Sequence, residues 1–293
     1  MKTRLLLTIL SVSFAFASCG NDNGTALTVI SYNIRQGVAD DGENSWIYRR
    51  PATKAMIEDC KPDIFGVQEA YPEQLLYISG NCMEYSCIGV GREDGAKEGE
   101  HMSIFYNRNS INLENWGTFW LSETPEKPSF GWDAACRRTA TWALMEHMPS
   151  GRKFYYVNTH LDHVGLTAQR EGLKLIVEKI GKINQEQYPM ILTGDFNVTP
   201  DNPALDDLNK IMKSARLHAE KTDTLASFNG WQKPISTAAL GDNLKADGYE
   251  SLTIDYIYYS GFTSCTEFET IRKEYEGVPF ISDHYPVRAT LKF

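Results

Sequence analysis

The sequence predicts a single α/β domain in which two packed β-sheets carry helices on their outer faces. Short apolar runs rich in β-branched and aromatic residues recur along most of the chain, and only a few stretches with helical spacing interrupt them. Some of these runs are apolar on successive residues, which is typical of strands covered on both faces. No repeat, low-complexity region or Pro/Gly-rich linker divides the 293 residues, so we expect one domain.

The expected elements are mostly strands separated by loops. Residues 27–34 form the first strand, a helix over 49–59 ends before the break at Lys61-Pro62, and residues 64–69 form the second strand. A second helix is expected over 167–183, where apolar residues recur at helical spacing. Further strands are expected at residues 85–90, 102–106, 139–146, 153–159, 190–193, 253–259, 265–271 and 286–291.

The first residues are expected to be an export signal. A positively charged start precedes the apolar run 5–17, which is too short for an ordinary transmembrane helix. Small residues then lead to Cys19, as in a bacterial lipobox, although Phe16 stands where leucine is usual. We therefore expect a lipoprotein signal peptide over 1–18, lipidation of Cys19 and a tether over 19–26, with an ordinary signal peptide as the alternative. The protein would face the periplasm or the cell surface of a Gram-negative bacterium, anchored in the outer membrane.

Charge and cysteine usage limit the function classes. The formal net charge is −9, and the leader contains Lys2 and Arg4, so the mature chain is more acidic still. Nucleic-acid binders usually present a basic surface, which disfavours long duplex DNA as the natural substrate. The cysteines after Cys19 have no metal-finger spacing. Cys82 and Cys87 are close enough for a disulfide in an oxidising compartment, and buried free thiols are an equally good interpretation.

Polar residues recur where the expected strands end or begin. A carboxylate at such a place needs a metal, a cation or hydrogen bonds to stay ionised. A single residue of this kind is weak evidence, because packing alone can place it there. A series of them along one chain indicates a site. The series consists of Asn33, Glu69, His160, Asp195, Asn197, Asp255, Asp283 and His284.

The order of these motifs resembles the endonuclease/exonuclease/phosphatase superfamily. The resemblance implies a four-layer α/β sandwich over residues 27–293 and hydrolysis of phosphate esters with Mg²⁺ or Mn²⁺ as cofactor. Segments 120–125, 131–133 and 137–142 look like those of a bacterial group of metal-dependent hydrolases. The superfamily motifs are Ser31-Tyr32-Asn33-Ile34-Arg35, Val67-Gln68-Glu69, Asn158-Thr159-His160-Leu161, Gly194-Asp195-Phe196-Asn197, Ile254-Asp255-Tyr256-Ile257 and Ser282-Asp283-His284.

By this resemblance, Glu69 would bind the metal, supported by Asn33 and Asp283. Asp195 would orient or deprotonate the attacking water, and Asn197 would contact the phosphoryl group beside it. Hard oxygen donors of this kind suit Mg²⁺.

The resemblance also assigns the two histidines. His284 would contact or protonate the phosphoryl group, or act as a base, with Asp255 holding its ring. His160 would bind phosphate or assist the leaving group, and Glu100 occupies the place of a glutamate that partners this histidine in the deoxyribonuclease branch.

Other residues are open to two interpretations. Arg35 and Arg138 are candidates for phosphate contacts or for structural salt bridges. Trp132 and Trp231 are candidate cleft residues because they flank loops. Asp162 and His163 either line the cleft or lie outside it, and His101 is expected at the surface.

These observations favour an exported phosphoesterase that hydrolyses a phosphomonoester or phosphodiester of a small molecule, lipid head group or glycan. The alternatives are a secreted nuclease, metal-assisted cleavage of a non-phosphate bond such as a glycosidic one, and a non-catalytic ligand-binding protein on the same fold. No protein partner is inferable.

Overall fold

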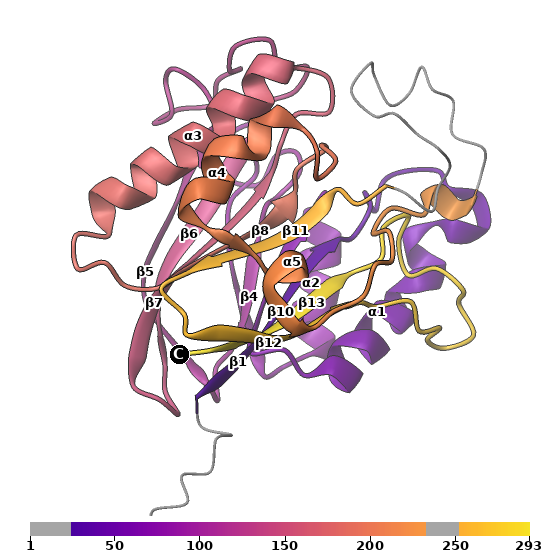
Figure 1. Ribbon diagram of the computed structural model, residues 1–293. Helices are drawn as coiled ribbons and strands as arrows, with labels where there is room; N and C mark the ends of the chain where they lie inside the picture. The colour runs from indigo at the N-terminus through magenta and orange to yellow at the C-terminus, as the bar shows by residue number, and fades with distance from the viewer. Residues whose placement is uncertain (1–24, 233–251) are drawn as a thin grey trace, which may run out of the picture.

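The computed structural model describes residues 25–232 and 252–293, which form two β-sheets flanked by helices (Figure 1). The expected signal peptide, the lipidation site Cys19 and nearly all of the tether lie outside these residues. Within the described part of the chain, no helix is long and apolar enough to cross a membrane.

The first sheet has seven strands in the order β10-β12-β13-β1-β2-β4-β3. The central strand β1 runs parallel to β2 and antiparallel to β13, so the sheet is mixed. Its strands are β1 (Ala26–Asn33), β2 (Ile64–Gln68), β3 (Tyr85–Ile88), β4 (Ile104–Asn107), β10 (Ala219–Lys221), β12 (Ser264–Thr270) and β13 (Val287–Lys292).

The second sheet has six strands in the order β5-β6-β7-β8-β11-β9. Strands β7 and β8 are parallel neighbours at its centre, and β11 pairs antiparallel with β8. Its strands are β5 (Ile111–Trp120), β6 (Thr139–His147), β7 (Arg152–His160), β8 (Met190–Asp195), β9 (Lys213–Ser214) and β11 (Asp255–Ser260).

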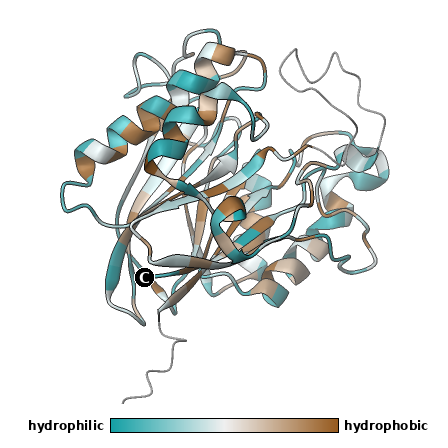
Figure 2. Cartoon of the chain, in the orientation of Figure 1, coloured by the Kyte–Doolittle hydropathy of each residue, from teal (hydrophilic) through white to brown (hydrophobic). Residues whose placement is uncertain are grey.

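Helices cover the two outer faces and complete four layers. Helices α1 (Trp46–Cys60) and α2 (Pro72–Asn81) lie on one side of the molecule, and α3 (Leu166–Ile183) and α4 (Asp206–Ile211) lie on the opposite side (Figure 1). Polar and apolar residues mix along α3, as expected for a helix with one face in water (Figure 2). The short elements are α5 (Ala215–His218) and the 3₁₀ turns Gly42–Asn44, Pro203–Leu205 and Gly230–Gln232.

Three hydrophobic clusters separate these layers and explain the continuous apolar runs. Val29 of β1 packs between the sheets, whereas its neighbour Ile30 packs toward α1 and α2. In the second sheet Tyr156 of β7 faces the first sheet, and Val157 faces α3. Because successive strand residues point to opposite faces, both faces of these strands must be apolar.

The structure confirms the predicted sandwich and most of its elements. Every strand expected from an apolar run is present, with ends that differ by a few residues. Helix α2 and strand β5, together with the short elements β9, β10, α4 and α5, were not predicted. Cys82 and Cys87 are both free thiols, so the structure supports the interpretation without a disulfide.

Candidate active site

Strand register brings the predicted polar residues to one edge of the sandwich. Asp195 at the end of β8 lies opposite His160 at the end of β7, and opposite Asp255 at the start of β11. Asn33 at the end of β1 lies beside the end of β2, which Glu69 follows directly. Residues far apart in the sequence therefore meet where the two sheets end.

A cavity of about 330 Å³ opens at this edge. That volume is at the lower end of the range for small-molecule sites. The cavity is lined by Arg35, Gln36, Glu69, Arg92, Glu100, Cys136, Arg138, His160, His163, Asp195, Asn197, Phe228, Ile254, Asp283 and His284.

His284 is held on two sides. Its Nδ1 lies 2.8 Å from Oδ2 of Asp255, and its ring packs edge-on against Phe228 with 4.8 Å between ring centroids. Burial opposes protonation of His284, but the charges of Asp255 and Asp195 outweigh burial and raise its pKa to about 10. The Nε2 atom then carries a proton 3.7 Å from Oδ2 of Asp195.

Asp195 lies at the centre of the site and contacts groups from several parts of the chain. Its Oδ1 accepts the backbone N–H of Asn197 at 2.9 Å, and its Oδ2 accepts Nδ2 of Asn33 at 2.9 Å. Burial raises the pKa of Asp195 to about 7, against the lowering effect of His284. A carboxylate with this pKa can gain and lose a proton near neutral pH.

His160 is neutral and has a defined tautomer. The Nδ2 of Asn197 lies 2.9 Å from Nε2 of His160, and because the amide nitrogen donates, Nε2 accepts. Burial, with the nearby charge of Arg138, holds the pKa of His160 well below its usual value. The proton therefore stays on Nδ1, a buried atom with no hydrogen-bond partner that lies 3.9 Å from Oε2 of Glu100.

Glu100 bonds to other groups more closely than to His160. Its Oε2 lies 2.6 Å from Nη1 of Arg92, and its Oε1 accepts Nε2 of Gln36 at 2.9 Å. Burial and the like charge of Glu69 raise the pKa of Glu100 to about 7. Neither Arg92 nor Gln36 was singled out from the sequence, because both lie in loops without a motif that marks them.

Asn33 supports two carboxylates at once. Its Nδ2 donates to Oε1 of Glu69 at 3.0 Å and to Oδ2 of Asp195, while its Oδ1 accepts the backbone N–H of Arg35. The last bond fixes which end of the amide faces the carboxylates. In this arrangement Asn33 positions Glu69 and Asp195 through its nitrogen.

Three residues of the site have left-handed backbone conformations. The φ angles of Arg35, Glu69 and Asn197 are 58°, 59° and 52°. Non-glycine residues seldom adopt this region, and such strain concentrates at functional sites. At Glu69 it occurs directly after β2, where the side chain also accepts the backbone N–H of Gln36 at 3.2 Å.

Both candidate arginines line the cavity, and both are paired with acids. Arg35 forms two bonds to Asp41, at 3.0 and 3.1 Å, and its Nε lies 3.7 Å from Oδ2 of Asp283. Arg138 lies 3.3 Å from Asp162 and is 4% exposed. Both arginines thus form structural salt bridges, and these salt bridges hold them in the cavity wall, where they remain candidates for phosphate contacts.

The structure does not bring the two tryptophans to the cavity formed by the described residues. Trp231 lies against the guanidinium of Arg49, 5.5 Å from the ring centroid. Trp132 has a φ of 50°, and its backbone N–H bonds to Glu123. Both tryptophans therefore make contacts within their loops. Their positions beside loops in the sequence could not show whether they would line the cleft or stabilise a loop.

The expectation that His101 lies at the surface is wrong. His101 is 4% exposed, and its Nδ1 lies 3.1 Å from the carbonyl oxygen of Gly99. Its backbone forms isolated bridges to Ala70 and Gly91, which pull the residue inward. Of the two residues Asp162 and His163, only His163 lines the cavity, whereas Asp162 is buried behind it.

A comparison with protein families identifies the family. The model described as the endonuclease/exonuclease/phosphatase family matches residues 30–284, from β1 to His284. The chain belongs to this family. It is accordingly a hydrolase that acts on phosphoester bonds.

Bacterial structures resemble this family member along nearly their whole length. An endonuclease/exonuclease/phosphatase from Bacteroides vulgatus is 33% identical, with a TM-score of 0.83, over 92% of this chain and 99% of the other. A mannosyl-6-phosphatase from Bacteroides thetaiotaomicron is 32% identical, with a TM-score of 0.80, over 91% and 100%. The uncharacterized protein L388 of Acanthamoeba polyphaga mimivirus is 27% identical over 89% of this chain and 98% of its own.

Enzymes of this family depend on divalent metals, and the donor atoms of this member fit such an ion. Glu69, His160 and Asp195 offer ligand atoms within 4.8 Å of one another. Burial raises the pKa of Asp283, and the like charge of Glu69 adds to the effect. Carboxylates gathered in this way are stabilised by a hard cation, which prefers oxygen ligands.

Proposed function

We propose that the protein is an exported, Mg²⁺- or Mn²⁺-dependent phosphoesterase that removes phosphate from a sugar or a short glycan. The observation that carries this proposal is the small, polar cavity in front of Asp195 and His284. Among the described residues that line it, the only apolar side chains are those of Cys136, Phe228 and Ile254, and the others are polar or charged. A lipid tail would need a larger apolar surface, whereas a leaving group rich in hydroxyls suits polar walls.

The comparisons support the same class of substrate. The Bacteroides thetaiotaomicron structure at 32% identity is a mannosyl-6-phosphatase, and it matches this chain over its full length. The net charge of −9 disfavours a nucleic-acid polyanion, because affinity for nucleic acid depends largely on phosphate neutralisation by basic residues.

The side chains at the site would divide the chemistry among them. Asp195, whose pKa is about 7, would accept a proton from the attacking water. His284, protonated at neutral pH, would donate from Nε2 to a phosphoryl oxygen as negative charge develops there. Asn197, whose two amide hydrogens go to Nε2 of His160 and the carbonyl oxygen of Leu161, would hold His160 in place beside the phosphoryl group.

Glu69 and Asp283 would hold the metal ion, with Asn33 keeping Glu69 in place. A divalent cation at this position neutralises charge on the phosphoryl oxygens when it is bound. Arg35, whose Nε lies 3.7 Å from Asp283, would keep the position of that carboxylate and add positive charge to the wall.

A panel of substrates tests the reaction. The purified protein would be assayed with Mg²⁺ or Mn²⁺ against hexose 6-phosphates, inositol phosphates, sphingomyelin, bis-p-nitrophenyl phosphate, plasmid DNA and RNA. We expect release of phosphate from a hexose phosphate that EDTA and His284→Ala both abolish. Preferential cleavage of DNA or RNA would instead support a nuclease. A folded protein that binds metal and cleaves nothing in the panel would contradict the proposal.

Export is tested separately. The features that support it are the apolar run 5–17 and Cys19 in the sequence. We expect the full chain to incorporate labelled palmitate and to fractionate with the outer membrane, and Cys19→Ala to lose both properties. Recovery of unlabelled wild-type protein from the cytosol would rule out a lipoprotein.

A further inference from the structure

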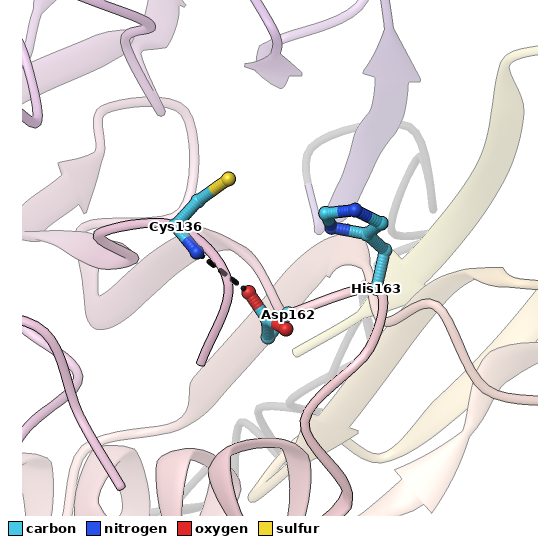
Figure 3. Close-up of side chains that lie close together, drawn as sticks. All are labelled: Cys136, Asp162 and His163. Atoms are coloured by element: carbon cyan, nitrogen blue, oxygen red, sulfur yellow. Dashed lines mark hydrogen bonds between the residues drawn. The ribbon is translucent and has the colours of Figure 1, made fainter. Parts of the chain in front are cut away.

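Cys136, Asp162 and His163 form a second cluster of possible metal ligands at the same cavity. Their ligand atoms all lie within 4.8 Å of one another (Figure 3). Cysteine, histidine and carboxylate together are typical ligands of Zn²⁺. These three residues either form a second metal site or have a different role, and their hydrogen bonds distinguish the two.

Hydrogen bonding shows that Asp162 has no capacity left for a metal. Its Oδ1 accepts the backbone N–H groups of Val164 and Gly165, at 3.0 and 2.8 Å. Its Oδ2 accepts those of Ala135 and Cys136, at 3.1 and 3.2 Å. In Figure 3 the dashed bond accordingly starts at the backbone nitrogen of Cys136.

Arg138 adds a positive charge where a metal would have to sit. Its Nε lies 3.3 Å from Oδ2 of Asp162, whose side chain is fully buried. Its Nη2 lies 2.9 Å from Nδ1 of His163. A metal ion at the cluster would have to displace this guanidinium from both partners and bear its repulsion.

The same contact fixes the tautomer of His163. A guanidinium has only donors, so Nδ1 of His163 must accept, and the ring proton lies on Nε2. Although the His163 side chain is exposed, partial burial and the charge of Arg138 lower its pKa, so the imidazole is neutral at neutral pH. His163 thus lines the cavity as a neutral side chain with one N–H donor in a set orientation.

The sheet order shows how far the backbone of Arg138, which holds this donor, lies from the reaction centre. Strands β8, β7 and β6 are consecutive neighbours, with Asp195 ending β8, His160 ending β7 and Arg138 directly preceding β6. Two strand spacings correspond to roughly 10 Å. Arg138 holds His163 on this side of the cavity wall, where its Nε2 can contact the group that carries the phosphate.

We propose that His163, oriented by Arg138, is a specificity-determining residue that donates a hydrogen bond from Nε2 to a hydroxyl of the sugar leaving group. This inference rests on the proposed function and adds the part of the site that distinguishes a carbohydrate phosphate from other phosphomonoesters. Arg138 is a positioning residue that acts through His163. Cys136 lines the same wall and serves as neither a ligand nor a donor.

The test compares two substrates in the purified, metal-loaded protein. The ratio of kcat/KM for a hexose 6-phosphate to that for p-nitrophenyl phosphate, which has no hydroxyls on its leaving group, is measured for the wild type and variants. His163→Phe should lower this ratio about tenfold, the effect of one lost hydrogen bond. His163→Gln, whose amide is a donor, should recover part of it.

The matched control is His218→Phe, which should leave the ratio within about twofold of the wild type, because this exposed histidine does not line the cavity. An unchanged ratio in His163→Phe, with normal cleavage of hexose phosphate by the wild type, would overturn the inference and leave the proposed function intact. Binding of Zn²⁺ that both His163→Phe and Cys136→Ser abolish would also overturn it. Absence of hexose phosphate cleavage by the wild type would remove both proposals.

Discussion

The Nδ1 atom of His284 lies 2.8 Å from Oδ2 of Asp255, and both side chains are buried. The bond orients the imidazole so that Nε2 faces Asp195 at 3.7 Å. The backbone N–H groups of Ile254 and Asp255 both bond to Oγ of Ser227, which fixes the backbone that carries the carboxylate. The histidine thus reaches the cavity already oriented and charged.

Asp255→Asn should reduce kcat by about 100-fold. Loss of the group that holds the second ring nitrogen of a functional histidine typically lowers activity about 10- to 100-fold. The amide keeps the size of the side chain but removes the charge that raises the pKa of His284 to about 10. Steady-state kinetics on the preferred substrate would measure the loss, with KM nearly unchanged and circular dichroism confirming the fold. Wild-type kcat in this variant would refute the role of Asp255.

Glu69→Gln should weaken metal binding while the fold persists. The substitution keeps the side-chain shape next to Asn33 and Gln36 but removes the negative charge. We expect Mn²⁺ or Mg²⁺ to raise the Tm of the wild type and to have little effect on the variant, because a ligand that binds only the native state stabilises it. Activity should fall about 100-fold or more. The exposed Glu98→Gln serves as the control and should respond to metal as the wild type does.

Most of the fold could be predicted because its central strands are buried on both faces. Strands such as β2 and β8 have every residue buried, so the sequence of each begins with a run of apolar residues and turns polar only toward its end. Strand β5 was missed because it lies at the edge of its sheet and includes the exposed polar residues Asn112, Glu114 and Asn115. Helix α2 was missed although Pro72 at its first turn is a recognised start signal.

The site could be predicted in part for the same reason. Asn33, Glu69, His160 and Asp195 lie at strand ends, and strand register brings strand ends together. Arg92, Gln36 and Phe228 reach the cavity from loops, whose paths depend on tertiary contacts that no local pattern reveals.

Arg49→Met should destabilise the protein by about 3 kcal/mol or more, because buried acceptors that lose their donors cost about 1–3 kcal/mol each. The guanidinium of Arg49 is fully buried and donates to the carbonyl oxygens of Asn44, Ile34, Ile281 and Arg35, at 2.7, 2.6, 3.0 and 3.0 Å. Urea unfolding would measure the loss. The adjacent Arg50→Met is the control and should cost less than about 1 kcal/mol, and equal losses in the two variants would contradict this account.

His147 should make the native state less stable in mild acid. The side chain is 2% exposed, its ring stacks on Phe293 with 5.4 Å between centroids, and its Nδ1 lies 2.8 Å from Oγ of Ser150. Burial lowers its pKa in the folded state. Below about pH 6.5, the usual histidine pKa, the unfolded chain therefore binds more protons at this position than the folded chain.

The contribution of neutral His147 to the free energy of unfolding is fully present above that pH. It is lost as the pH falls through the lowered pKa of His147 in the folded state. His147→Gln removes the titration while retaining polar groups near Ser150. Urea unfolding of both proteins at pH 5 and pH 8 isolates the effect, since the other titrating groups are common to them. We expect the free energy of unfolding to fall more steeply toward pH 5 in the wild type than in the variant. Parallel curves would mean that His147 titrates alike in both states, in which case burial against Phe293 does not disfavour its charge.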